Sequence, residues 1–274
     1  MKTISPYTTS LHPGNAYWMA RLSKEIYRKR SEEDPAPDEK RILRSLQEDD
    51  KRFQSVRGVD KNSTQAALVA HQDYLCMVFR GTDELVDWLD NINAFSTKQL
   101  FGEFHRGFWH SVEDVWEVLF SGYQELLERK KRPLFITGHS LGGAMATIAA
   151  ARFLHEGRPF TSVYTFGQPR ALTRETARIF NAECKSRFFR FHNNNDIVTR
   201  APARLMGYSH AGHYLYISEQ KTIHPEVGFW FRFLDYFDGA FESLKQQGSL
   251  DLIADHDINE YLDAVERWNL RCNP

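Results

Sequence analysis

A run of 19 residues without a charged side chain, Pro133–Ala151, constrains the fold of this chain more than any other feature. Its length would suit a membrane span, but a histidine, a serine and three glycines interrupt its centre. An apolar, β-type segment precedes the interruption and an alanine-rich segment follows it. The run therefore predicts a strand over 133–137, a tight turn and a helix over 141–155.

The turn has the sequence Gly138-His139-Ser140-Leu141-Gly142, a GxSxG pattern that is weak alone and informative between a strand and a helix. In that setting it indicates a nucleophile elbow, in which glycines avoid collisions with neighbouring backbone. The alternative is an ordinary helix start with Ser140 as the N-cap. Because a serine hydroxyl is a poor nucleophile, the elbow requires a base and an orienting carboxylate, in the chain order Ser, Asp or Glu, His.

The rest of the chain alternates strand and helix patterns, with helices also predicted in the first 50 residues around a charged loop at 31–40. Further strands are predicted at 66–70, 75–79, 161–166, 186–191 and 214–218, and helices at 110–131, 173–183, 226–246 and 257–269. Such alternation predicts an α/β fold, a mostly parallel sheet with helices on both faces. No linker divides the 274 residues, so we expect a single domain over 1–274.

Charge and cysteine usage exclude several classes of protein. With 35 basic and 36 acidic side chains the net charge is −1, which is not the balance of a nucleic-acid-binding protein. The three cysteines include no CxxC pair, so neither a metal site nor a disulfide framework is indicated. Residues 1–10 lack the apolar core of a secretory signal, which predicts a cytoplasmic location, with signal-independent export as the alternative.

Asp196 is the carboxylate with the most suggestive surroundings, because it follows a predicted strand and would lie at the same sheet edge as Ser140. An Asx-turn aspartate is an equally good interpretation of that position. Four histidines follow it, and the chain order alone does not choose between them: His210, His213, His224 and His256. The first two resemble a metal pair but lack a third ligand nearby, whereas His256 lies on a loop directly before a helix.

Several motifs in the right order resemble the class 3, or fungal-type, lipase family of the α/β-hydrolases, from about Thr64 to Tyr261. The matching segments are Phe79-Arg80-Gly81-Thr82, His105-Arg106-Gly107-Phe108, Gly138 to Gly143, Phe166-Gly167-Gln168-Pro169-Arg170, Asn195-Asp196-Ile197-Val198 with Arg200 and Pro202, and Asp255-His256 with Tyr261-Leu262. The chain departs from the family pattern at Thr199 and Ala201, and it lacks the disulfides of secreted fungal members. Its first 60 residues do not match the family pattern.

The resemblance implies Ser140 as nucleophile, Asp196 as orienting acid and His256 as general base. It also implies an oxyanion hole made by the backbone N–H groups of Leu141 and Thr82. It implies an α/β-hydrolase fold with a helical lid after residue 82. No metal or cofactor is expected for this chemistry.

The segment after Thr82 has the amphipathic pattern of a lid helix. The apolar residues on one side of its helical wheel are Leu85, Val86, Trp88, Leu89 and Ile92. The alternative is a fixed surface helix. A second aromatic run, at 227–241, is better interpreted as core than as an acyl groove or a membrane contact.

The resemblance therefore implies a serine ester hydrolase that acts on a lipid or small ester, with a triacylglycerol ahead of a phospholipid and a lipid–water interface as a partner. The alternatives are an esterase for soluble or feruloyl-type esters, a phospholipase A1 and a lipase-like binding module without catalysis. The oligomeric state is not predicted.

Overall fold

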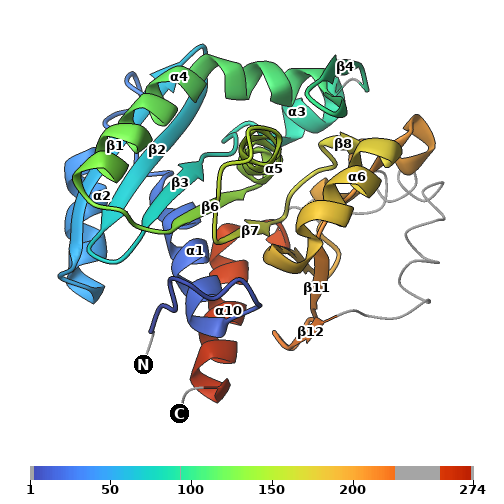
Figure 1. Ribbon diagram of the computed structural model, residues 1–274. Helices are drawn as coiled ribbons and strands as arrows, with labels where there is room; N and C mark the ends of the chain where they lie inside the picture. The colour runs from blue at the N-terminus through green and yellow to red at the C-terminus, as the bar shows by residue number, and fades with distance from the viewer. Residues whose placement is uncertain (1–2, 93, 226–253, 273–274) are drawn as a thin grey trace.

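The computed structural model describes residues 3–92, 94–225 and 254–272, and a large twisted sheet forms its centre (Figure 1). In spatial order its eight strands are β1 (Phe53–Lys61), β2 (Thr64–His71), β3 (Leu75–Phe79), β6 (Leu134–His139), β7 (Ser162–Phe166), β9 (Phe188–Asn193), β11 (His213–Ile217) and β12 (Ile223–Pro225). Neighbours from β3 to β11 pair in parallel, and β1, β2 and β12 extend the sheet with antiparallel pairs.

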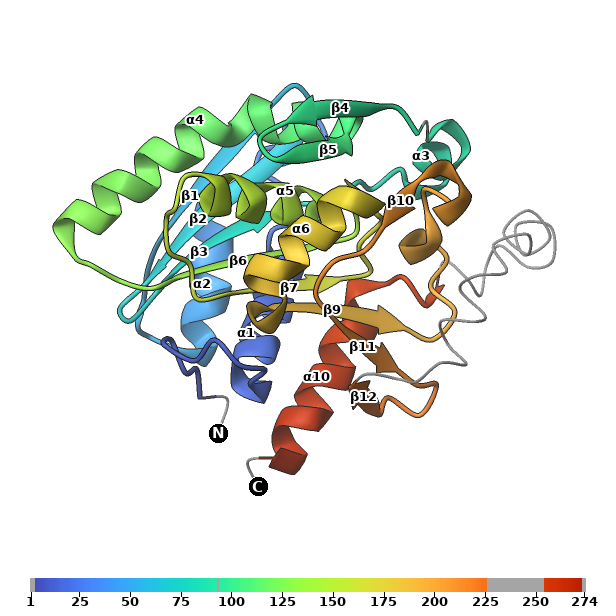
Figure 2. The ribbon, with the colours of Figure 1, turned by 45° about the vertical axis from the view of Figure 1, so that its right-hand side comes forward.

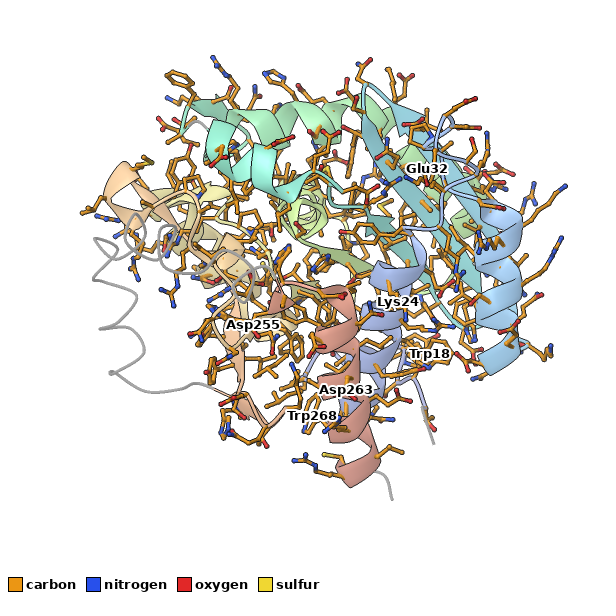
Figure 3. All side chains as sticks on the ribbon, turned by 180° about the vertical axis from the view of Figure 1, so that it is seen from behind. Trp18, Lys24, Glu32, Asp255, Asp263 and Trp268 are labelled. Carbon is orange, nitrogen blue, oxygen red and sulfur yellow. The ribbon has the colours of Figure 1, made fainter. Side chains whose placement is uncertain are left out.

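Helices cover both faces of this sheet (Figures 1 and 2). One face carries α4 (Arg106–Arg129), α5 (Leu141–His155) and α6 (Arg174–Cys184). The other carries α1 (Pro13–Glu25), α2 (Glu39–Asp49) and α10 (Ile258–Cys272). Figure 3 shows α1 and α10 side by side, so the two ends of the chain pack together on one face.

The central strands are apolar because both of their faces are covered. Every residue of β2, β3, β6 and β7 is buried. The alanines of α5 let that helix lie close to the sheet, and nearly all of its residues are buried. The predicted α/β fold with a mostly parallel sheet and helices on both faces is therefore confirmed.

A second, smaller antiparallel sheet lies beside the short helix α3 (Leu85–Asn91) (Figure 2). Its strand order is β10 (Tyr208–Ser209), β8 (Leu172–Thr173), β5 (Gly102–His105) and β4 (Ser96–Gln99). Three short 3-10 helices complete the described elements, at Lys185–Arg187, Val198–Arg200 and Arg204–Met206. The sequence patterns did not predict this sheet.

Two predictions, the helix over 226–246 and the aromatic run at 227–241, lie outside the described residues. Within the part of the chain that the structure describes, no helix combines the length and the apolar character needed to cross a membrane.

Candidate active site

The candidate residues gather at the carboxyl edge of the parallel strands. Ser140 directly follows β6, Asp196 lies three residues after β9, and Thr82 lies three residues after β3. Parallel strands bring their carboxyl ends to one edge of a sheet, where α/β proteins place their sites. His256 arrives from far along the chain, on the turn that precedes α10.

The backbone of Ser140 has the strained conformation of a nucleophile elbow, with φ of 58° and ψ of −134°. The glycines on either side are needed because the backbones approach closely. A Cβ at Gly138 would lie 2.2 Å from the Gly142 oxygen, and a Cβ at Gly142 would lie 2.1 Å from the Phe79 oxygen. The N-cap alternative receives no support, since the Ser140 side chain makes no capping hydrogen bond.

We expect Gly142→Ala to lower the free energy of unfolding by about 1–3 kcal/mol, because the new methyl group overlaps backbone that cannot move aside. Gly122→Ala, inside α4, is the matched control, since a Cβ there meets only the side chains of Leu68 and Arg57 at ordinary contact distances. Helix propensity should make that control more stable by up to about 1 kcal/mol. Urea unfolding of both variants checks the contrast, and equal stability would contradict the close approach.

Asp196 and His256 form a buried hydrogen-bonded pair. The His256 Nδ1 lies 2.8 Å from Asp196 Oδ2, and the two side chains are 5% and 0% exposed. The other carboxylate oxygen, Oδ1, accepts the Val198 N–H at 2.9 Å. The Tyr261 hydroxyl also donates to Oδ2 and itself accepts the Asn193 N–H. This arrangement fixes the carboxylate and, through it, the plane of the imidazole.

Three consecutive asparagines attach the loop that carries His256 to the loop that carries Asp196. The Asn193 side chain donates to the Asp255 carbonyl at 2.8 Å. The Asp255 carboxylate accepts the Asn194 side chain at 3.0 Å and the Asn195 N–H at 3.2 Å. The polar turn after β9 therefore brings together residues about sixty positions apart.

The remaining link of a serine–histidine–aspartate relay is not formed in this state. Ser140 Oγ and His256 Nε2 are both buried, and neither has a hydrogen-bond partner among the described residues. The His256 ring packs 4.5 Å, between centroids, from the ring of His139, the residue before Ser140. Such catalytic hydrogen bonds are often long without substrate and shorten when it binds.

Burial controls the ionisation of the groups around this pair. It lowers the pKa of His139 well below its usual value, and a positive charge on His256 would lower it further. Burial and the negative charge of Asp196 raise the pKa of Tyr261 well above its usual value. Burial also raises the pKa of Asp255. The site thus keeps His139 and Tyr261 neutral.

The two expected oxyanion donors flank the serine. Leu141 is the first residue of α5, so its N–H belongs to the helix start, where amides have no partner within the helix. The loop before Thr82 touches the elbow, since a Cβ at Gly81 would lie 2.8 Å from the Ser140 Cβ. The Thr82 hydroxyl accepts the Glu84 N–H at 3.0 Å and so stabilises its own loop.

The predicted lid residues form α3 and its end: Leu85, Val86, Trp88 and Leu89 lie in the helix and Ile92 is its C-cap. The buried Leu89 packs with Ile197, Val198 and Ala201, which follow Asp196 in the chain. Ser140 is 1% exposed and His256 4% exposed, so the site is closed.

The other three candidate histidines do not join the site. His210 donates through Nε2 to the Thr199 carbonyl at 2.7 Å, His213 begins β11, and His224 lies in β12. No group of three potential metal ligands occurs in residues 3–92, 94–225 and 254–272.

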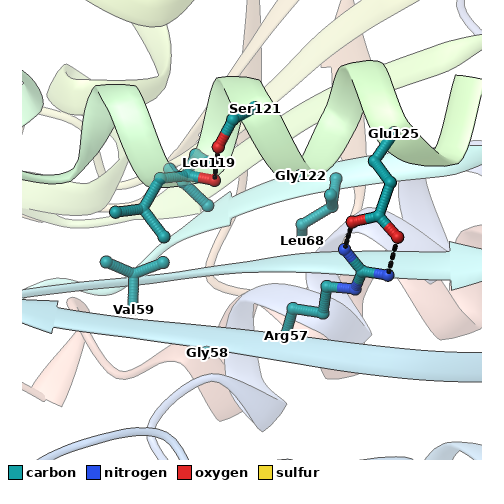
Figure 4. A pocket seen from close by; sticks show the side chains of 9 residues that line it. Arg57, Gly58, Val59, Leu68, Leu119, Ser121, Gly122 and Glu125 are labelled. Carbon is teal, nitrogen blue, oxygen red and sulfur yellow. Dashed lines mark hydrogen bonds and ion pairs between the residues drawn. The ribbon is translucent and has the colours of Figure 1, made fainter.

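A pocket of about 270 Å³ lies between α4 and the strands β1 and β2 (Figure 4). The Arg57–Glu125 ion pair forms one wall. The lining contains none of the candidate site residues, so this pocket is not the acyl site.

Sequence reasoning missed Tyr261 and His139 as functional residues. Tyr261 belongs to one of the motifs shared with the family, but the motif assigns it no role. Its position along α10 is typical of a residue that packs in the core. His139 occupies the variable position of the GxSxG pattern. Neither role has a signal in a single sequence, because each depends on a contact between distant segments.

Residues 76–206 match the model of a protein family that is described as lipase (class 3). A secreted mono- and diacylglycerol lipase A from Penicillium cyclopium is 29% identical over 138 residues, covering 49% of this chain and 45% of that protein. Phospholipase A1-II 1 from Oryza sativa subsp. indica is 30% identical over 225 residues, covering 69% of this chain and 56% of that protein. The chain spans about half the length of the curated relatives it matches.

Solved structures show the same fold. A mutant form of MDLA from Penicillium cyclopium superimposes with a TM-score of 0.66 at 22% identity, covering 77% of this chain and 82% of that chain. A triacylglycerol lipase described as having a serine protease triad gives a TM-score of 0.63 at 21% identity, covering 74% of this chain and 79% of that chain. The expected α/β-hydrolase fold is therefore confirmed.

The predicted cytoplasmic location is wrong. The Penicillium relative and two other fungal relatives are named as secreted lipases, which points to an extracellular location. The prediction relied on an apolar leader not being visible in residues 1–10, and such an absence carries no information about where a protein works.

Proposed function

Since this chain belongs to the class 3 lipase family, we propose that it is a serine hydrolase of glycerolipid esters that uses Ser140, His256 and Asp196. The observation that carries the proposal is the buried His256–Asp196 hydrogen bond of 2.8 Å beside a strained serine elbow. Since Nδ1 is engaged by Asp196, Nε2 is the nitrogen available to the serine.

The geometry suits acyl transfer. His256 Nε2 takes the proton of Ser140 Oγ as the oxygen attacks the ester carbonyl, and Asp196 stabilises the resulting imidazolium. The N–H groups of Leu141 and Thr82 hold the negative oxygen. The imidazolium then protonates the departing alcohol, and water, activated by the same histidine, releases the acid. Apart from the ester and this water, these steps use only side chains and amides of this chain.

Labelling with a fluorophosphonate, together with a substrate panel, tests the proposal. We expect the protein to take the label at Ser140 and to hydrolyse a diacylglycerol or triacylglycerol emulsion. A protein that takes no label and hydrolyses no ester, under conditions where a control lipase does both, is a binding module instead. Phosphatidylcholine vesicles belong in the same panel, because the rice relative is named a phospholipase A1. Faster release of fatty acid from them than from acylglycerols favours that second candidate.

We also propose that α3 is a lid over this site and that it opens at a lipid surface. Leu89→Ala removes about 2 kcal/mol of packing from the closed form. The variant should therefore hydrolyse a dissolved short ester up to about 30-fold faster and gain less from an emulsion than the wild type does. Leu270→Ala, on the exposed side of α10, is the control and should leave both rates unchanged. A fixed surface helix predicts no gain for either variant.

An extracellular location agrees with this proposal, because acylglycerol emulsions are substrates that a secreted enzyme meets.

The buried Cys76 and Cys184 and the exposed Cys272 are all unbridged, so no disulfide joins these cysteines.

A further inference from the structure

Tyr27 lies just beyond the end of α1, outside residues 76–206 that match the family model, and reaches the catalytic edge of the sheet. Figure 3 shows Lys24, near this end of α1, and Asp255, beside the start of α10, at the same end of the helix pair. The Tyr27 hydroxyl is 2.9 Å from the His139 Nδ1. The segment that directly follows the first helix therefore contacts the nucleophile elbow.

The partners of His139 determine where its hydrogen lies. Its Nε2 is 2.7 Å from the His256 carbonyl oxygen, and a carbonyl oxygen can only accept. Nε2 must therefore carry the hydrogen. Because burial keeps His139 neutral, Nδ1 is an acceptor, and the Tyr27 hydroxyl must donate to it.

The Tyr27 hydroxyl also packs closely against Gly81, in the loop after β3. Gly81 immediately precedes Thr82, one of the proposed oxyanion donors. A Cβ at Gly81 would lie 2.4 Å from the Tyr27 hydroxyl and 2.8 Å from the Ser140 Cβ. Tyr27, the loop of Thr82 and the elbow are thus packed without a gap.

We propose that Tyr27 is a positioning residue that joins the three proposed catalytic segments by a chain of two hydrogen bonds and a packing contact. Tyr27 donates to His139 Nδ1, His139 Nε2–H donates to the His256 carbonyl, and the Tyr27 hydroxyl packs against Gly81. The chain and this contact fix the oxyanion loop relative to the serine and the backbone of the general base. This role rests on the proposed function, and Tyr27 itself does not touch the substrate.

Tyr27→Phe keeps the ring and removes only the hydroxyl. We expect kcat for p-nitrophenyl butyrate, a dissolved ester, to fall by about 10- to 100-fold, because small displacements of catalytic groups are costly. KM should stay within about twofold, since no substrate contact is lost. The rate of fluorophosphonate labelling should fall in proportion to kcat.

Tyr164→Phe is the matched control. Tyr164 is buried in β7, and its hydroxyl accepts the His12 N–H, at the other end of α1. A helix of 13 residues is about 20 Å long, so this hydroxyl is far from the catalytic edge. Both variants lose a buried hydroxyl that contacts the α1 region, and both should lower the urea midpoint. Only Tyr27→Phe should lower kcat.

His139→Asn breaks the second half of the chain, because the shorter amide reaches the position of Nδ1 but not that of Nε2. We expect a similar loss of kcat, and the double variant should lose no more than the worse single variant. Tyr27→Phe or His139→Asn, whichever folds, is enough to test the positioning role. If kcat matches that of Tyr164→Phe, the positioning role is wrong while the hydrolase stands. If the wild type neither turns over ester nor takes the label, it is the proposed function that fails.

Discussion

Ser140→Ala is expected to lower kcat for every ester substrate by about 10⁶-fold, the cost of removing a serine nucleophile that acts together with its base. The variant keeps the oxyanion donors and the His256–Asp196 pair, so substrate should still bind. The alanine methyl group is smaller than the side chain it replaces, in a position that is 1% exposed, so the fold should persist. Initial rates on p-nitrophenyl butyrate and on an acylglycerol emulsion measure the loss.

Ser162→Ala is the control for this experiment, because Ser162 is equally buried and lies in the neighbouring strand β7. Its kcat should remain within about twofold of the wild type, since it lies outside the relay. More than a thousandth of the wild-type rate remaining in Ser140→Ala would place the nucleophile elsewhere. Unfolding midpoints of both variants separate a loss of chemistry from a loss of structure.

The parts of the fold that the sequence predicted well are those with strong local signals. The apolar runs of β2, β3, β6 and β7 and the alanines of α5 are long and buried, so their patterns are unambiguous. The first strand, β1, escaped prediction because it is an edge strand, buried only at Phe53, Val56 and Val59, and irregular near its start. That spacing of three hides the alternation of a strand.

The small sheet was missed because its strands β4 and β5 have four residues each and are largely polar, and β8 and β10 have two. Such short strands exist only through pairing with one another, so no local pattern specifies them.

The organisation of residues 1–274 as a single domain stays a prediction.

For the site, the residues alone identified Ser140 firmly but left four histidines open. The choice of His256 required the family resemblance, because nothing near it in the sequence indicates a contact with Asp196. That contact depends on the asparagine turn binding Asp255, and the positioning chain through Tyr27 depends on α1 reaching β6. Both are tertiary contacts between segments far apart in the sequence, which periodicity cannot reveal.

Asp196→Asn is expected to lower kcat by about 10⁴-fold through the wrong tautomer of His256. In the wild type, Oδ1 accepts the Val198 N–H, and Oδ2 accepts from both His256 Nδ1 and the Tyr261 hydroxyl. The asparagine oxygen should keep the Val198 amide, because the amide needs an acceptor. This orientation aims the new NH₂ group at His256 Nδ1, which must then accept, so the hydrogen moves to Nε2. A protonated Nε2 cannot take the proton of Ser140.

Asp255→Asn is the matched control, since Asp255 is the neighbour of His256 and its carboxylate bonds Asn194 and the Asn195 N–H without reaching the imidazole. Weakening those bonds should cost less than about tenfold in kcat. The pH dependence of kcat for both variants distinguishes the mechanisms. In alkaline solution, hydroxide can begin to replace the disabled base in Asp196→Asn, so the relative deficit of that variant should shrink as the pH rises. Equal losses in the two variants would mean that Asp196 only holds its loop in place, and the orienting role would then be wrong.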